Sequence, residues 1–512
     1  MDRKRKHESI EGEGVTEFLP LENDLITSEE LESILSADDY KQLQENIEKG
    51  KIKDVNMTIT ADTDISLLMM AGEAGAIECV KVLLANNADV NYTDYYERSA
   101  VTSAAESGNT NLLLLILSRD ELEADLVYEA LHDPLCSGSS AFELSTEVAE
   151  LLISRLPDVN RKVNGECLLL NHAARGAYLN IVSMLLESGS DPNLTDCNGV
   201  DALYAASMEG RFEVIKLLIE FDSPHKISME SINKGYLCAC YEGCIEIVSY
   251  LIEKGADISA TEDNGGPAID YAIHNNNIPL AKLLIENGFN VNLIYYARSA
   301  LHFACVRMYD EMAKLLLDSG ADPDLRYPDG SSLLLRLVTL TCDSQADYTP
   351  YITLLLDRGA NVNLAYERTG QTALMIAGSS ANIDMVKLLL DHDADPNIHY
   401  PDGSSLLLKL VMATCDKHGN YFPYITLLLN HGANVNIAHS VTGQTALMTA
   451  AQAQDVDLVK LLLEHGADVT QVNKEGKSVL DMLGRTRSHA KVAELCHAYV
   501  DCNRVDSKAI LK

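Results

Sequence analysis

Three cysteines lie close together in the sequence and are the first candidates for metal chemistry. Cys238, Cys240 and Cys244 occur within the segment GYLCACYEGCIEIV. Zinc would need a fourth ligand and ligand spacing of the loop type. Cys238 and Cys240 are only two residues apart on a predicted helix, which brings together residues three or four apart. Cysteine is also among the most frequently buried residue types. We interpret all three as small apolar core residues, and we expect no metal and no cofactor.

Motifs that support catalysis are absent from the sequence. It contains no Gly-rich phosphate loop, no His-Glu-x-x-His helix, no Gly-x-Ser-x-Gly elbow and no kinase signature set. Segments such as DADPN and GANVN are rich in Asp and Asn. They lack the ligand spacing and the terminal glutamate of a calcium loop. We therefore expect a protein that is not an enzyme.

The overall charge restricts the kind of partner. Among 512 residues, 40 Lys and Arg face 76 Asp and Glu, which gives a formal net charge of −36. Such a charge disfavours binding to nucleic-acid phosphates or anionic lipid. It favours a protein partner or a basic peptide, and we expect no nucleic-acid binding.

Two sequence features bear on location. The densest apolar run, Leu112 to Leu117, is far shorter than the roughly 18 residues of a membrane-spanning helix, so we expect no membrane insertion. The N-terminus lacks the apolar core of a signal peptide. We expect a cytoplasmic or nuclear protein, and the run Arg3, Lys4, Arg5 and Lys6 is a candidate nuclear import signal.

A short motif recurs along most of the chain. Its copies include LLANNADVN (83–91), LLESGSDPN (185–193), LLDRGANVN (355–363) and LLNHGANVN (428–436), and most neighbouring copies lie 32 to 34 residues apart. A short helical segment such as SALHFAC or QTALMIA precedes each copy. One helix pair of this kind cannot bury its own apolar stripe, so the repeats are expected to stack.

This pattern resembles the ankyrin repeat, over roughly residues 61–484. The resemblance implies an all-α solenoid of about 12 to 13 helix-turn-helix repeats, with β-hairpin fingers between them. In the repeat at 366–398, Gly370 permits the turn and Thr372 is placed to cap the inner helix. The pattern weakens around 121–160, where an inner helix near 128–146 is poorly defined.

The segment YPDGSSLLL occurs at 327–335 and again at 400–408. About 46 of 73 positions are identical between 321–393 and 394–466, which indicates a duplicated repeat pair within 321–466. One repeat of each pair is longer by seven residues, in TCDSQADYTPY (341–351) and TCDKHGNYFPY (414–424). Pro350 and Pro423 are placed to start the following outer helices.

The two ends differ from the repeats. Residues 1–25 are expected to form a flexible charged arm, and residues 26–60 a helical N-terminal cap. In that cap Thr27 and Glu30 suggest a capping box, and Asp38 is the candidate cap of a second helix ending near Gly50. Residues 485–512 are expected to form a C-terminal capping helix and tail.

The resemblance implies protein binding through finger tips and inner helices. Tyrosines and acidic residues in the fingers are our candidate contacts for a partner protein or basic peptide. The alternative is that the tyrosines pack finger against finger. The candidates are Tyr92, Asp94, Tyr95, Tyr96, Glu97, Tyr295, Tyr296, Tyr327, Asp329, Tyr366, Glu367, Tyr400 and Asp402.

The resemblance also implies that Asn91, Asn363 or Asn436 is a candidate substrate of an asparaginyl hydroxylase. We expect a monomeric solenoid that serves as a scaffold or adaptor. Two alternatives stay open, namely the substrate-recognition subunit of a ubiquitin ligase and a host-directed ankyrin effector. Residues 485–512 show no SOCS box or F-box.

Overall fold

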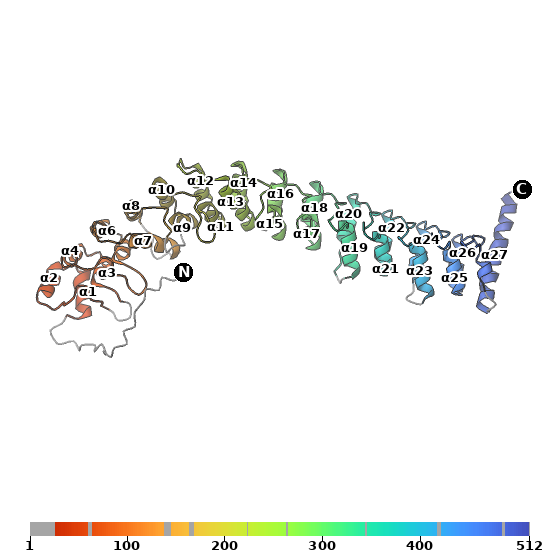
Figure 1. Ribbon diagram of the computed structural model, residues 1–512, viewed down its shortest axis with the longest axis horizontal. Coiled ribbons are helices and arrows are strands. Elements are labelled where there is room, and N and C mark those ends of the chain that lie inside the picture. The colour runs from red at the N-terminus through yellow and green to blue at the C-terminus, as the bar shows by residue number, and fades with distance from the viewer. Residues whose placement is uncertain are drawn as a thin grey trace. The chain divides into compact units, whose positions relative to one another are not determined.

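Helices account for nearly all regular structure in the chain (Figure 1). The computed structural model describes residues 26–59, 64–137, 145–162, 168–222, 224–262, 265–343, 346–416, 421–483 and 487–510. These residues belong to two compact units, unit 1 up to Asp257 and unit 2 from Ile258 onward. The candidate nuclear signal Arg3 to Lys6 lies outside the described residues.

Within the described residues, unit 1 contains an N-terminal helix pair and six further pairs, in which odd-numbered helices are inner and even-numbered helices are outer. Its helices are α1 (Ser28–Ser36), α2 (Tyr40–Glu48), α3 (Leu67–Glu73), α4 (Ile77–Ala85), α5 (Ala100–Glu106), α6 (Thr110–Leu117), α7 (Ala124–Ser137), α8 (Thr146–Ser154), α9 (Leu169–Arg175), α10 (Leu179–Glu187), α11 (Ala202–Met208), α12 (Phe212–Glu220), α13 (Met229–Glu242) and α14 (Ile245–Glu253).

In its described residues, unit 2 contains six more pairs and a C-terminal helix. Figure 1 shows the inner and outer helices of unit 2 in two rows. Its helices are α15 (Ala268–His274), α16 (Ile278–Glu286), α17 (Ala300–Val306), α18 (Asp310–Asp318), α19 (Leu333–Asp343), α20 (Thr349–Asp357), α21 (Ala373–Ser379), α22 (Ile383–Asp391), α23 (Leu406–Cys415), α24 (Phe422–Asn430), α25 (Ala446–Gln452), α26 (Val456–Glu464), the 3-10 helix η1 (Leu480–Met482) and α27 (Arg487–Ile510).

The pair α21 and α22 shows why these segments fold only as a stack. Helix α21 has seven residues, too few for an isolated helix to be stable in water. Thr372 caps it by accepting a hydrogen bond from the Met375 N–H, as predicted. Gly378 lets α23 approach, because a Cβ there would lie 3.0 Å from Leu406 Cδ1. The apolar stripe of α22 is buried by its neighbours.

Seven fingers in the part of the chain that the structure describes are tight turns closed by a single bridge, and others, such as Tyr327 to Ser331, are closed by turn hydrogen bonds alone. Antiparallel bridges join Thr93 to Ser99 and His399 to Ser405, and no longer strand pairing accompanies them in the described residues. The predicted β-hairpins are thus reduced to their minimum. Gly370 adopts φ of +68°, a left-handed conformation that favours glycine.

The N-terminal cap confirms one predicted helix start and corrects another. Thr27 and Glu30 form the capping box at α1. The prediction for Asp38 was wrong, because Asp39 caps α2. Asp38 instead caps α4, where its carboxylate accepts hydrogen bonds from the N–H groups of Glu78 and Cys79. At the other end of the chain α27 packs against α25 and α26.

The weak repeat near 121–160 contains a defined inner helix. It spans Ala124–Ser137 rather than 128–146 and packs against α5, α8 and α9. Proline at position 134 lies inside it. The difference arises because the periodicity did not reveal where this helix begins, and residues 138–144 lie outside the described ranges.

The lengthened repeats extend their inner helices and anchor the next outer helix. Helix α19 has 11 residues and α23 has 10, against seven in α21. Pro350 and Pro423 lie in the first turns of α20 and α24, as predicted. The buried side chains of Tyr351 and Tyr424 donate hydrogen bonds to Asp310 and to the Ala381 carbonyl of the preceding repeats.

Two remaining predictions concern cysteines and the membrane. Cys238 and Cys240 are buried on α13, as predicted for core residues, and Cys244 is half-buried. Burial raises the pKa of the Cys240 thiol to about 12, so it is protonated at neutral pH. In the described ranges no helix combines the length and the apolar character needed to span a membrane.

Candidate functional site: a groove on the inner-helix face of unit 2

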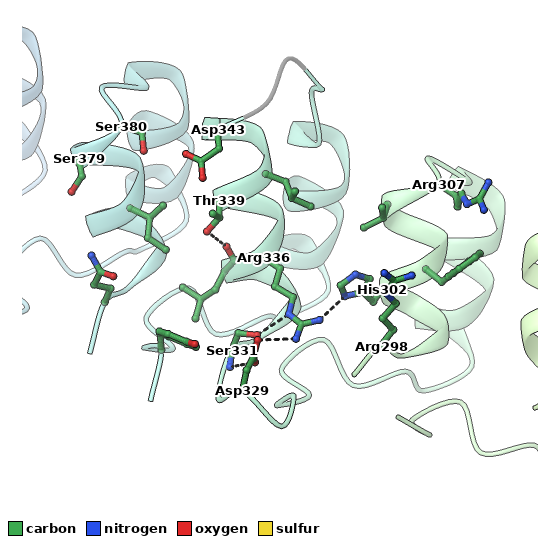
Figure 2. Close-up of a pocket in the computed structure, with 17 residues that line it drawn as sticks. Arg298, His302, Arg307, Asp329, Ser331, Arg336, Thr339, Asp343, Ser379 and Ser380 are labelled. Atoms are coloured by element: carbon green, nitrogen blue, oxygen red, sulfur yellow. Dashed lines mark hydrogen bonds and ion pairs between the residues drawn. The ribbon is translucent and has the colours of Figure 1, made fainter. Parts of the chain in front are cut away.

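A half-open groove lies over three consecutive inner helices of unit 2, α17, α19 and α21 (Figure 2). Its volume is about 820 Å³, within the range of sites that enclose a compact ligand. Side chains from the finger loops before each helix complete its wall. We call this site the α17–α21 groove.

The helices that carry the groove begin at well-defined caps. The Ser299 hydroxyl accepts a hydrogen bond from the His302 N–H, 3.2 Å away, at the start of α17. At α19 the Ser332 hydroxyl accepts from the Leu335 N–H at 3.4 Å. Fixed helix starts determine which side chains of each short helix face the groove.

Arg336 on α19 is the most heavily bonded side chain of the groove. It donates to Asp329 Oδ2 at 3.0 Å, to Ser331 Oγ at 2.8 Å and to the Ala297 carbonyl at 2.7 Å. Its guanidinium also lies 3.9 Å from the centre of the Tyr327 ring, a cation–π contact. Figure 2 shows Arg336 between the finger residues Asp329 and Ser331 and the His302 ring. Arg336 therefore ties two fingers to the inner helix.

These contacts set the charge states inside the groove. Burial alone would raise the pKa of Asp329, but hydrogen bonds from Ser331 and Arg336 hold that pKa at about 2. Burial, together with the positive charges of Arg336 and Arg298, lowers the pKa of His302 to about 4. At neutral pH the histidine is therefore uncharged and the aspartate is ionised.

The duplicated repeat rebuilds the same arrangement 73 positions later. Lys409 takes the place of Arg336, with its Nζ 3.0 Å from Asp402 Oδ2 and 3.7 Å from the centre of the Tyr400 ring. Hydrogen bonds from Ser404 and then Lys409 hold the pKa of Asp402 well below its usual range. Tyrosine, aspartate and a cation on the inner helix thus form a repeated structural unit.

The finger tyrosines divide into three groups by exposure. Tyr327 and Tyr400 expose 3% and 7% of their surface, so the packing alternative holds for them. Tyr95, Tyr96 and Tyr296 expose 79%, 63% and 75% and are available to a partner. The others, Tyr92, Tyr295 and Tyr366, are half-buried.

The acidic candidates are largely paired within the chain. Asp94 is buried, and its Oδ2 accepts hydrogen bonds from Arg98, with Nε at 2.9 Å. Asp329 and Asp402 are paired as described above. Glu97 and Glu367 are exposed, and Glu367 lies 3.5 Å from Arg326 Nε. Four of the five charges expected to meet a basic peptide are therefore paired with cations of the chain itself.

Asparagines at the bases of several fingers link one repeat to the next. The Asn363 side chain accepts a hydrogen bond from the Asp395 N–H at 2.7 Å and donates to the Asp393 carbonyl at 3.3 Å. Asn436 makes the same pair of bonds to Asp468 and Gly466, and Asn91 to Glu123 and Glu121. We call these bonds the asparagine ladder. Hydroxylation of Asn91, Asn363 or Asn436 stays a prediction, which mass spectrometry after treatment with an asparaginyl hydroxylase would test.

Sequence reasoning missed the cationic side chains of the groove. Arg298 and Arg307 line it together with Arg336, and Phe303 and Ile376 supply apolar surface. A signal was present for Phe303, Arg336 and Ile376, which lie on inner helices whose other positions carry mostly Ala, Leu and Cys. Arg298 lies in the finger before α17 and Arg307 directly follows that helix, so no helical pattern marked them.

Short inner helices packed side by side, outer helices behind them and single-bridge fingers define a solenoid of helical repeats. The family model for ankyrin repeats matches residues 36–129, 138–230, 170–262, 236–327, 339–400 and 410–506. The chain therefore belongs to the ankyrin-repeat family, in agreement with the predicted fold.

Similar proteins carry such repeats in different contexts. An ankyrin repeat and KH domain-containing protein of Caenorhabditis briggsae is 25% identical over 59% of this chain, which covers 14% of that protein. Human ankyrin repeat and SOCS box protein 6 is 27% identical over 46% of the chain and 60% of its own length. The crystal structure of the ankyrin repeat domain of Bcl-3 aligns with 44% of this chain and 97% of that domain, at 24% identity and a TM-score of 0.36.

Proposed function

We propose that this protein is a non-catalytic scaffold or adaptor that holds a segment of a partner protein in the α17–α21 groove. The observation that carries the proposal is the groove itself, whose wall combines apolar side chains from three successive inner helices with arginines from the α17 and α19 repeats. Interface anchors are enriched in aromatic residues and arginine. The groove supplies both, on helices whose positions are fixed by caps and close packing.

Site-specific crosslinking tests this function. Ser379 is exposed at the end of α21 and lines the groove, while Lys387 is exposed on α22, the outer helix of the same repeat. A photo-reactive amino acid at position 379 is expected to capture partner proteins that the same group at position 387 does not capture. Identical capture from both positions would refute the assignment of the groove as the binding site.

A second surface, in unit 1, favours the basic partner expected from the net charge. Glu73, Glu106, Glu209 and Glu242 lie at or just beyond the ends of inner helices α3, α5, α11 and α13 and are exposed. Arg175 interrupts this row on α9. Exposed Tyr241, with 58% of its surface accessible, lies beside Glu242. Acidic and aromatic groups in one row suit a cationic peptide.

A basic peptide titration tests the second surface. Reversal of Glu73 and Glu242 to Lys is expected to weaken binding of a lysine-rich peptide and leave capture at position 379 unchanged. The alternative role, a substrate-recognition subunit of a ubiquitin ligase, is motivated by the SOCS box relative. Purification of the protein from cells would favour that role if ligase subunits copurified in fixed proportion, and would count against it if they were absent.

A further inference from the structure

Two arginines of the α17–α21 groove carry charge that the chain does not balance. Arg298 and Arg307 are exposed, and within the described residues neither has a carboxylate at ion-pair distance. Arg336 differs, because its charge is already matched by Asp329 at 3.0 Å. The groove therefore offers two free guanidinium groups beside one paired one.

The remaining groups of the groove do not cancel these two charges. Asp343 is the one other carboxylate among the lining residues that the structure describes. His302 is uncharged at neutral pH, for the reasons given above. A surplus of positive charge thus occurs locally in a chain whose formal net charge is −36.

Apolar side chains lie among these charges. Phe303 and Val306 on α17, Leu340 on α19 and Ile376 on α21 are half-buried and line the groove. The Arg307 guanidinium lies 5.2 Å from the centre of the Phe303 ring, so it contacts an aromatic ring rather than a carboxylate. Half-buried apolar surface beside free cations is suited to a segment that carries both apolar and acidic residues.

The duplicated repeat extends the same character along the inner-helix face. Met412 on α23 occupies the position equivalent to Thr339 and exposes 46% of its surface. Lys409 on the same helix repeats the position of Arg336. A segment longer than the groove would therefore meet further apolar and cationic surface on α23.

Building on the proposed function, we propose that the α17–α21 groove binds an acidic segment of a partner protein. Carboxylates of the segment meet Arg298 and Arg307, and its apolar side chains contact Phe303, Val306 and Ile376. Arginine guanidinium groups can engage carboxylates through two parallel hydrogen bonds. Nucleic acid, the other polyanion, is disfavoured because a long phosphate backbone would extend beyond the groove over a chain whose formal net charge is −36.

A peptide selection on the full-length chain tests the proposal. A library of random 16-residue peptides is selected for binding, and the recovered peptides are synthesised with a fluorophore and titrated by anisotropy. The expected peptides combine Asp or Glu with Leu, Ile or Phe, and crosslink to position 379. Raising the salt concentration is expected to weaken their binding, because exposed charges are screened.

Charge variants identify the residues responsible. Arg298→Glu combined with Arg307→Glu is expected to weaken binding at least ten-fold, and the double Gln variant is expected to lie between it and the wild type. The matched control is Lys282→Glu combined with Lys387→Glu, which makes the same change in net charge on outer helices α16 and α22 and is expected to leave affinity unchanged. Circular dichroism melting curves verify that each variant is folded.

The outcomes separate this inference from the proposed function. Recovery of basic or uncharged peptides that still crosslink to position 379 would refute the acidic partner and leave the scaffold function standing. Affinity unchanged in the double Glu variant would do the same. Displacement of the peptides by single-stranded RNA with equal affinity would overturn the choice of a protein partner. Failure of any peptide or protein to crosslink at position 379 would refute both proposals.

Discussion

Two titrating groups in unit 2 are expected to change its stability in opposite directions when the pH falls. His302 lies on α17 and Asp270 on α15, the neighbouring inner helix. The pKa of His302 is lowered from 6.5 to about 4, chiefly by burial. Burial raises the pKa of Asp270 from 3.8 to about 6. The larger part of each pH window lies above the isoelectric point of 4.6, so most of each effect can be measured while the chain keeps a negative charge.

The signs follow from proton linkage. Between pH 6.5 and about 4 the unfolded state binds more protons at position 302 than the folded state, so the free energy of unfolding decreases as the pH falls. From about pH 7 to about pH 5.5 this loss amounts to about 1 kcal/mol. Folded Asp270 binds more protons than the unfolded chain between pH 6 and 3.8, so its contribution rises with acidity. That gain is roughly 0.5 kcal/mol over the same interval once reduced for partial exposure of the carboxyl.

Single substitutions should separate the two effects. His302→Gln is expected to remove about 1 kcal/mol of the stability lost on acidification, and Asp270→Asn to make the loss steeper by roughly half that amount. Hydrogen exchange of the amides in α15 and α17, corrected for intrinsic exchange rates, measures local opening free energies without assuming two-state unfolding of the array. Comparison of each variant with wild type at both pH values cancels the contributions of the other titrating groups to the pH dependence of stability.

One result would refute this reasoning directly. An NMR titration in which the His302 imidazole changed charge near pH 6.5 would show that neither burial nor the arginines depress its pKa. An equal pH slope in wild type and His302→Gln would lead to the same conclusion. The arrangement of Arg336, Asp329 and His302 as the electrostatic framework of the groove would then have to be abandoned.

Three further outcomes concern stability. Gly403 and Gly432 have nearly the same φ, +85° and +84°. A Cβ at Gly403 would lie 2.9 Å from Ser440 Cβ, whereas a Cβ at Gly432 would have no neighbouring atom within 4 Å. In urea unfolding, Gly432→Ala is therefore expected to cost about 1 kcal/mol and Gly403→Ala about 1 to 3 kcal/mol more. Asn363→Ala is expected to cost about 1 kcal/mol by removing two hydrogen bonds whose backbone partners are exposed to water, and unaltered exchange of the Asp395 amide would contradict that. Asp38→Ala should destabilise the start of α4 by about 1 kcal/mol, visible as faster exchange at Cys79.

The repeat architecture could be derived from the sequence because the same short motif recurs many times along the chain. The spacing of the LLxxGAxxN copies located the outer helices, and single residues such as Thr27, Thr372 and Pro350 marked helix starts through local chemistry. Each of these signals involves residues within a few positions of one another. Local interactions of this kind leave a direct trace in the order of residues.

The site could not be derived in the same way because its contacts cross repeats. Tyr327 is buried where Arg336 lies over its ring and Ser299 and His302 of the preceding repeat contact it. Asp329 is balanced by an arginine on another element. Asp38 caps a helix that begins 39 residues later, at Ile77. The sequence identified tyrosines and acids as notable residues. It did not indicate which of them the chain itself would pair, and so it placed the binding chemistry in the fingers rather than in the cationic groove.

The asparagine ladder has a mechanical consequence for unit 2. Asn292, Asn363, Asn397 and Asn436 each clasp the following repeat at two backbone atoms. A pulling force applied along the stack would load these clasps in series, so the weakest of them would yield first. With donor–acceptor distances of 2.7 and 3.5 Å, the clasp of Asn397 is the loosest of the four. Asp324 occupies the equivalent position between Asn292 and Asn363, where it accepts from the Asn361 N–H at 2.8 Å but has no amide group to donate the second bond. Under tension, unit 2 is thus expected to lengthen in steps of one repeat, beginning at the boundary between the fingers of Asp324 and Asn361.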